Sequence, residues 1–292
     1  MNIGLKTDAP MANIALMKIS SYYKKKGDIV QWVDPLIHYD IIYYSKIFNF
    51  DTNETKLSAD RIIKGGTGFD VITKLAEDIE NIKDVDYSIY PKCNYSIQFF
   101  SRGCFRNCSF CLVRQKEGYI HPVEPVDLNP RGKIIEVLDN NFFGNPEWKT
   151  AIKYLQEKNQ KVNFHGVDIR IITEEQCEAL NTLRHYKQVH IAWDNVNDKT
   201  VPENIKIMLK YFKAYKLMCY VLIGYNSTPE EDLYRVETLR SLKIDPFVMA
   251  YNKNDLYQKR FARWVNHKAI FKTVKWGDYG KKINKLNNKQ LF

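Results

Sequence analysis

A repeated alternation of short apolar runs and amphipathic segments over residues 95–250 constrains the fold most strongly. The runs are rich in β-branched and aromatic residues, which is typical of strands in a parallel sheet buried on both faces. Serial β/α units curl such a sheet into a barrel or partial barrel, although an open doubly wound sheet has the same pattern. We predict an α/β fold with a partial (β/α)6 TIM-like barrel. Its strands are predicted at residues 96–100, 134–138, 162–167, 189–193, 219–224 and 246–250.

Two of the intervening helices begin with a capping box, in which a threonine and the Glu or Gln three residues later each accept a hydrogen bond from the other's backbone N–H. One box is Thr173-Glu174-Glu175-Gln176, and the other is Thr228-Pro229-Glu230-Glu231. Apolar residues at helical spacing follow both boxes. We therefore predict helices that start after Thr173 and after Thr228.

The first 90 residues form a different pattern. An apolar run at 2–5, a helix-like segment at 12–25 and a second apolar run at 29–33 predict a β-α-β start of Rossmann type. A glycine-rich stretch at 64–68 is predicted as a loop. We therefore predict three parts, which are a small N-terminal α/β (Rossmann-like) unit at 1–90, the partial barrel at 91–250 and a C-terminal extension at 251–292.

The formal charge of +10 is concentrated in that extension, which carries a local charge of +9 and leaves the rest of the chain nearly neutral. Residues 257–266 interleave basic and aromatic side chains, as in channels that bind nucleic acids. The alternative is an amphipathic helix that docks Phe261, Trp264 and Val265 on the barrel and leaves its cations in water. We favour the docked helix and keep nucleic acid as an alternative partner.

The N-terminus lacks a basic segment followed by a long apolar one, so no secretory signal is predicted. No stretch approaches the roughly 18 unbroken apolar residues of a membrane helix. We therefore expect a cytoplasmic protein without a membrane partner.

Three of the six cysteines lie within eight residues, at Cys104, Cys108 and Cys111, with the spacing C-x3-C-x2-C. Thiolates are soft ligands suited to iron–sulfur clusters or zinc. A structural zinc site normally has four protein ligands, and there is no second cysteine pair here. Three protein ligands would leave one metal position open, as a reactive centre needs.

This motif, on the loop after the first predicted barrel strand, resembles the signature of the radical S-adenosylmethionine (radical SAM) superfamily. The resemblance implies that Cys104, Cys108 and Cys111 bind three irons of a [4Fe–4S] cluster, whose fourth iron chelates SAM. It also implies that Phe110 lies near the adenine of SAM. The activity it implies is reductive cleavage of SAM to methionine and a 5′-deoxyadenosyl radical, which abstracts hydrogen from a substrate.

The resemblance suggests further SAM contacts at the carboxyl ends of strands. Asp139 and Asn140 occupy the place of a turn that receives the methionine amino group, with a plain Asx turn as the alternative. Arg170 could pair with the SAM carboxylate or only with Asp168. The remaining candidates are Asp194, which could instead cap a helix, Gly224 near adenine, and Met249, whose side chain is expected in the core.

The turn at 138–142 is similar to that of cobalamin-associated and methylthiotransferase-like members of the superfamily. Their cobalamin domains usually carry a D-x-H-x-x-G element, which is absent here, and His38 is the only N-terminal candidate for a cobalt ligand. The sequence therefore disfavours cobalamin. Cys177 and Cys219 are predicted as buried apolar residues, and His165 and His190 as core side chains within strands.

The sequence leaves the substrate open. We expect a small molecule or a peptide, and an electron donor such as flavodoxin or ferredoxin. One alternative is a radical SAM enzyme that modifies RNA or DNA through the basic tail. An alternative of another class is a non-enzymatic, zinc-stabilised nucleic-acid-binding module.

Overall fold

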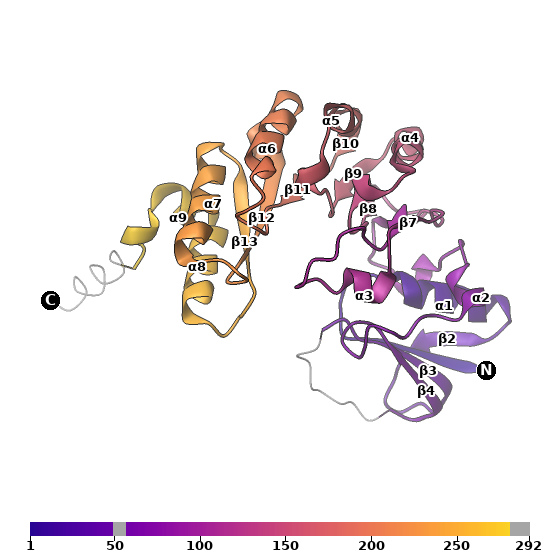
Figure 1. Cartoon of the computed structure of the whole chain (residues 1–292). Coiled ribbons are helices and arrows are strands. Elements are labelled where there is room, and N and C mark those ends of the chain that lie inside the picture. Colours follow the sequence, from indigo (N-terminus) through magenta and orange to yellow (C-terminus); the bar gives the residue numbers. More distant parts are fainter. Residues whose placement is uncertain (49–56, 281–292) are drawn as a thin grey trace. The chain divides into compact units, whose positions relative to one another are not determined.

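The computed structural model describes residues 1–48 and 57–280, which divide into two compact units between Leu138 and Asp139 (Figure 1). Both units are mixed α/β with parallel sheets, which confirms the predicted fold class at this level. None of the described helices has the length and apolar composition needed to cross a membrane. The boundaries predicted at residues 90 and 250 stay predictions.

The first unit begins with a parallel sheet in the order β2-β1-β3-β4. Its strands are β1 (Asn2–Thr7), β2 (Ile29–Trp32), β3 (Tyr39–Ser45) and β4 (Ala59–Gly65). Helix α1 (Ile14–Lys25) connects β1 to β2, so the predicted β-α-β start is confirmed. Strand β4 was not predicted, and it extends into the stretch expected to be a loop.

The hydrophobic core of this part of the unit lies between the sheet and α1. Leu16, Met17 and Ile19 of α1 are almost fully buried, as are Ile3 and Leu5 of β1. Each such side chain stabilises the fold by about 1.5–3 kcal/mol relative to an exposed one. The remaining helical elements of this part are α2 (Glu77–Glu80) and the 3-10 turn η1 (Tyr87–Ile89).

The second half of the first unit carries the cysteine loop. Strands β5 (Ser96–Gln98) and β8 (Ile134–Val137) pair in parallel, as predicted. Between them in the sequence, β6 (Ser101–Arg102) and β7 (His121–Pro122) form a short antiparallel pair, and α3 (Val113–Glu117) precedes β7. The loop is thus closed at its base by a two-stranded ladder.

The second unit contains the other four predicted strands, all in parallel pairs. They are β9 (Lys161–Phe164), β11 (Val189–Ala192), β12 (Leu217–Ile223) and β13 (Asp245–Ala250), with the short β10 (Arg184–His185) paired to β9. The intervening helices are α4 (Trp148–Lys158), α5 (Glu174–Asn181), α6 (Thr200–Tyr211) and α7 (Pro229–Ser241). Both predicted capping boxes are present, at the starts of α5 and α7.

The sheet β11–β12–β13 has two unlike faces. Ile191, Cys219 and Val248 on one face are at most 2% exposed. On the other face Phe247 is 41% and Met249 is 40% exposed. The expectation that these strands are buried on both faces, with Met249 in the core, is therefore wrong at β13.

The C-terminal extension forms α8 (Leu256–Asn266), α9 (Lys268–Thr273) and the 3-10 turn η5 (Trp276–Asp278). Helix α8 packs on β13 and buries the apolar side chains Phe261, Trp264 and Val265. Its cations Lys259, Arg260 and Arg263 are exposed, and Arg260 also donates a hydrogen bond to the Tyr279 carbonyl. The docked amphipathic helix is therefore confirmed, whereas residues 281–292 lie outside the described residues.

Candidate functional site

The three cysteines of the motif lie on the loop between β6 and β7. Cys104 and Cys108 are half-buried, and Cys111 is exposed. Within residues 1–48 and 57–280, no three His, Cys, Asp or Glu side chains are already assembled as a metal-holding group. The structure places the three thiols on one short loop.

Glu117 anchors the start of this loop. Its carboxylate accepts hydrogen bonds from the Gly103 backbone N–H at 3.0 Å and from Arg102 Nη2 at 2.7 Å. The Cys104 backbone N–H donates to the Gly118 carbonyl at 3.3 Å. Sequence reasoning missed Glu117, because no motif links it to the cysteines and only the fold brings it beside them.

Gly103 is required by the close approach of the two sides of the loop. Its φ of +78° lies in the left-handed region, and a Cβ atom there would lie 2.5 Å from the Tyr119 carbonyl oxygen. Gly118, opposite, has a similar φ of +77° but open space around it. The residue before the first cysteine is thus sterically confined to glycine.

The chemistry of the donor set fits an iron–sulfur cluster with three protein ligands. The Arg106 backbone N–H points to Cys104 Sγ at 3.4 Å, and Arg114 Nη1 donates to the Cys104 carbonyl at 3.2 Å. The thiolate is the form of cysteine that binds iron. Phe110, just before Cys111, is half-buried on the same loop.

In the second unit, polar side chains follow β9 in the 3-10 turn η3 (Ile169–Ile171). Arg170 forms a bidentate pair with Asp168, with Nε–Oδ1 at 2.7 Å and Nη2–Oδ2 at 3.1 Å. Arg170 Nη1 lies 3.5 Å from Asp198 Oδ2. The ion pair with Asp168, which was the alternative prediction for Arg170, is thus present. The guanidinium lies beyond the carboxyl end of β9.

The turn after β8 contributes a residue that was not predicted. Asp139 is 1% exposed, whereas Asn140 is exposed. Asn141, the next residue, caps the 3-10 turn η2 (Phe142–Gly144), and its Nδ2 donates to Asp168 Oδ2 at 3.1 Å. The amide of Asn141 therefore joins this turn to the Asp168–Arg170 pair.

Asp194 follows β11 and holds a buried carboxylate. Its Oδ1 has no hydrogen-bond partner in the described part of the chain. Burial raises the pKa of Asp194, and the charges of Arg170 and Arg235 oppose this rise. Arg235 Nη1 donates to the Trp193 and Asp194 carbonyls, each at 2.9 Å. A buried carboxylate oxygen without a partner is an acceptor available to a ligand hydroxyl.

Gly224 and Met249, the other two residues of the second unit that were predicted to contact SAM, lie directly after β12 and on β13, respectively. Gly224 follows β12 with φ +73°, and a Cβ there would lie 2.1 Å from the Gln258 Nε2 of α8. Met249 lies on the open face of β13. The backbone of the adjacent Val248 is bonded to Asn266, since its N–H donates to Oδ1 at 2.7 Å and its carbonyl accepts from Nδ2 at 3.0 Å.

His38 does not fit the role of a cobalt ligand. It precedes β3, at the amino ends of the parallel strands, whereas ligands of such sheets bind at the carboxyl ends. Both ring nitrogens are engaged, Nδ1 with Ser58 Oγ and Nε2 with Asp60 Oδ1, each at 2.9 Å.

The predictions for the remaining cysteines and histidines have mixed outcomes. Cys177 and Cys219 are fully buried, as predicted, and burial raises the pKa of the Cys177 thiol to about 11. His190 lies in β11 and is 9% exposed, also as predicted. The prediction for His165 is wrong, because this residue follows β9 and is exposed.

No protein-family model and no curated protein matches the sequence. Among solved structures, the chain is similar to the radical S-adenosylmethionine methyltransferase TsrM from Kitasatospora setae, solved with cobalamin and a [4Fe–4S] cluster. The TM-score is 0.62 at 10% identity, over 85% of this chain and 72% of that one. TsrM with its tryptophan substrate and a SAM analogue gives the same TM-score, 0.62, at 11% identity.

A likeness at this identity shows the fold. The prediction that disfavoured cobalamin gains no support from it, because one of these structures contains cobalamin. The chain therefore shares a fold with solved structures of a radical SAM methyltransferase, and this similarity agrees with the radical SAM resemblance of its three-cysteine motif.

Proposed function

We propose that the protein is a radical SAM enzyme. The observation that carries this proposal is a loop with the three cysteines of the motif, anchored by Glu117, in a chain that shares the fold of TsrM. When bound by Cys104, Cys108 and Cys111, a [4Fe–4S] cluster would supply the electron that cleaves SAM to methionine and a 5′-deoxyadenosyl radical. We also infer that the predicted strands form a partial (β/α)6 barrel.

The chain's own residues would hold and orient SAM. We infer that the buried Asp194 carboxylate accepts hydrogen bonds from the ribose hydroxyls, and that the Arg170 guanidinium binds the methionine carboxylate. Asp139 and Asn140 are assigned to the methionine amino group. Phe110, Gly224 and Met249 are assigned to the adenine. Such contacts would fix the sulfonium in one orientation and exclude water from it.

We infer that the substrate is a small molecule or a peptide from which the radical abstracts hydrogen. Methyl transfer is a second candidate reaction, because the similar structures belong to a methyltransferase. The two reactions leave different products of SAM, so the products separate them. The electron donor is expected to be a small low-potential protein such as flavodoxin or ferredoxin.

The test is anaerobic reconstitution of the full chain with iron and sulfide, followed by reduction with dithionite in the presence of SAM. We expect bound iron, and formation of 5′-deoxyadenosine and methionine in equal amounts. S-adenosylhomocysteine would instead support methyl transfer. Tightly held zinc, with neither iron nor SAM binding, would overturn the proposal in favour of a metal-stabilised binding module.

Gly103→Ala is expected to lower the amount of iron taken up on reconstitution. The left-handed backbone costs alanine about 1–2 kcal/mol, and the clash with the Tyr119 carbonyl adds a displacement of the loop. Gly118→Ala is the control, since it also places alanine at a positive φ but meets no clash. Iron contents that are equal in the two variants would show that the close approach at Gly103 does not matter.

Asp194→Asn is expected to raise the melting temperature at pH 7 by a few degrees and to weaken SAM binding. The pKa of Asp194 is raised in the folded protein, above the ordinary aspartate value of 3.8. The stabilisation that the Asp194 carboxyl contributes is therefore fully present below pH 3.8 and is lost as the pH rises through the folded pKa. Asparagine stays neutral at every pH, so the difference in melting temperature between the variant and the wild type should shrink as the pH falls toward 3.8. Thermal unfolding at several pH values checks this, and a lower melting temperature at pH 7 would contradict it.

A further inference from the structure

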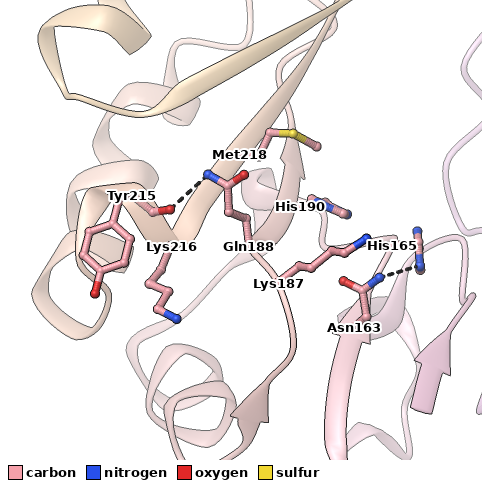
Figure 2. A pocket seen from close by; sticks show the side chains of 8 residues that line it. All are labelled: Asn163, His165, Lys187, Gln188, His190, Tyr215, Lys216 and Met218. Atoms are coloured by element: carbon pink, nitrogen blue, oxygen red, sulfur yellow. Dashed lines mark hydrogen bonds between the residues drawn. The ribbon is translucent and has the colours of Figure 1, made fainter. Parts of the chain in front are cut away.

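The second unit contains a pocket of about 450 Å³, and Figure 2 shows the side chains that line it. Gln188 and Lys216, which help to line it, directly precede β11 and β12. Asp194 and Gly224 follow the same two strands. His190 of the pocket and Asp194 are four residues apart, which is roughly 13 Å along a strand. The pocket therefore lies toward the amino ends of these strands.

The pocket is electropositive. Lys187 and Lys216 line it, and neither forms an ion pair among the residues that the structure describes. The nearby Asp245 is already paired, with Lys268 at 2.6 Å and with Lys272 at 3.3 Å. Figure 2 shows the ammonium end of Lys187 lying toward His165 and Asn163. No Asp or Glu belongs to the lining, so an anion would meet only cationic or neutral groups.

A row of rings leads from the pocket across the open face of the sheet. The ring centroids of His165 and His190 are 5.6 Å apart, those of His190 and Tyr220 are 5.5 Å apart, and those of Tyr220 and Phe247 are 5.7 Å apart. His165 and His190 are shared by the row and the pocket. A planar ring could therefore stack along the sheet while an attached anionic group stays near Lys187.

We propose that this pocket binds an anionic small molecule with an aromatic ring, held by its phosphate or carboxylate at Lys187 and by its ring along His190 and Tyr220. None of the pocket residues is assigned to SAM, although His165 is next to Gly166, which closely approaches the Asp139 carbonyl. Occupancy of the pocket therefore does not depend on SAM cleavage, and the two proposals can fail independently. Lys216 would add to the positive potential at the rim.

Isothermal titration of the full chain with phenyl phosphate, benzoate, inorganic phosphate and benzyl alcohol tests the proposal. We expect phenyl phosphate or benzoate to bind at least about tenfold more tightly than inorganic phosphate or the neutral alcohol. The better of the two ring-bearing anions identifies the anionic group. Equal binding of all four probes, or no binding of either ring-bearing anion, would overturn the proposal.

Two variants locate the binding. Lys187→Gln should weaken binding of the better probe about tenfold, because a charge-assisted hydrogen bond is lost. Lys153→Gln, on the exposed side of α4, is the matched control and should bind like the wild type. Thermal unfolding verifies that both variants are folded, and Lys216→Gln provides a second measurement at the pocket. Unchanged affinity in both pocket variants would overturn the proposal.

Discussion

Replacing Cys108 by alanine is expected to abolish both iron–sulfur cluster assembly and SAM cleavage. Cys108 is the middle ligand of the proposed three-thiolate set, and its loss leaves two thiols on the loop. Two ligands do not hold a cluster that takes three from the protein, and no other thiol lies within the motif. Iron and sulfide content after anaerobic reconstitution measures assembly, and 5′-deoxyadenosine measures cleavage.

Cys93→Ala is the matched control. Cys93 is a half-buried free thiol of the same unit, and its Sγ donates to the Tyr95 carbonyl at 3.3 Å. It lies outside the motif, so iron content and SAM cleavage should stay at the level of the wild type. If Cys108→Ala retained both properties, Cys108 would not be a cluster ligand and the proposed function would lose its main support.

Replacing Arg235 by methionine is expected to lower the free energy of unfolding by about 3–5 kcal/mol. Arg235 and Asp232 on α7 are both completely buried, with Nη2–Oδ1 at 2.6 Å. The variant would leave the Asp232 carboxylate as an uncompensated buried charge. It would also remove the donor to the Trp193 and Asp194 carbonyls, which ties α7 to the end of β11. Urea unfolding curves measure the change.

Lys206→Met is the matched control, because Lys206 and Glu203 have the same three-residue spacing on α6 but are exposed. An exposed helical pair contributes only about 0.3–0.5 kcal/mol. A second variant, in which Asp232→Asn is combined with Arg235→Met, removes the orphaned charge and should recover part of the loss. Equal losses in Arg235→Met and Lys206→Met would show that burial of the pair does not set its contribution.

Much of the fold could be predicted because its signals are local. Each of the six strands predicted between residues 95 and 250 is present, since a buried strand needs a short apolar run wherever it pairs. The capping boxes at Thr173 and Thr228 are likewise complete within four residues. The three cysteines also stand close in sequence, so their spacing alone predicts a common metal centre.

The elements that were missed depend on partners distant in sequence. Strand β4 is largely exposed and carries charged residues, so it lacks the apolar pattern and forms by pairing with β3. The open face of β13 could not be predicted either. An apolar run does not indicate whether a neighbouring element covers both of its faces.

The sequence by itself determined the parallel β/α pattern, the helix starts and the three-thiol motif, because each depends on residues that are close together in the sequence. Only the tertiary structure decided that Glu117 anchors Gly103, that Arg235 binds the carbonyls after β11, and that two lysines border one pocket. The physical reason is that a polar side chain takes its partner from whatever the packed backbone brings within hydrogen-bond distance. Spacing along the chain does not encode that distance.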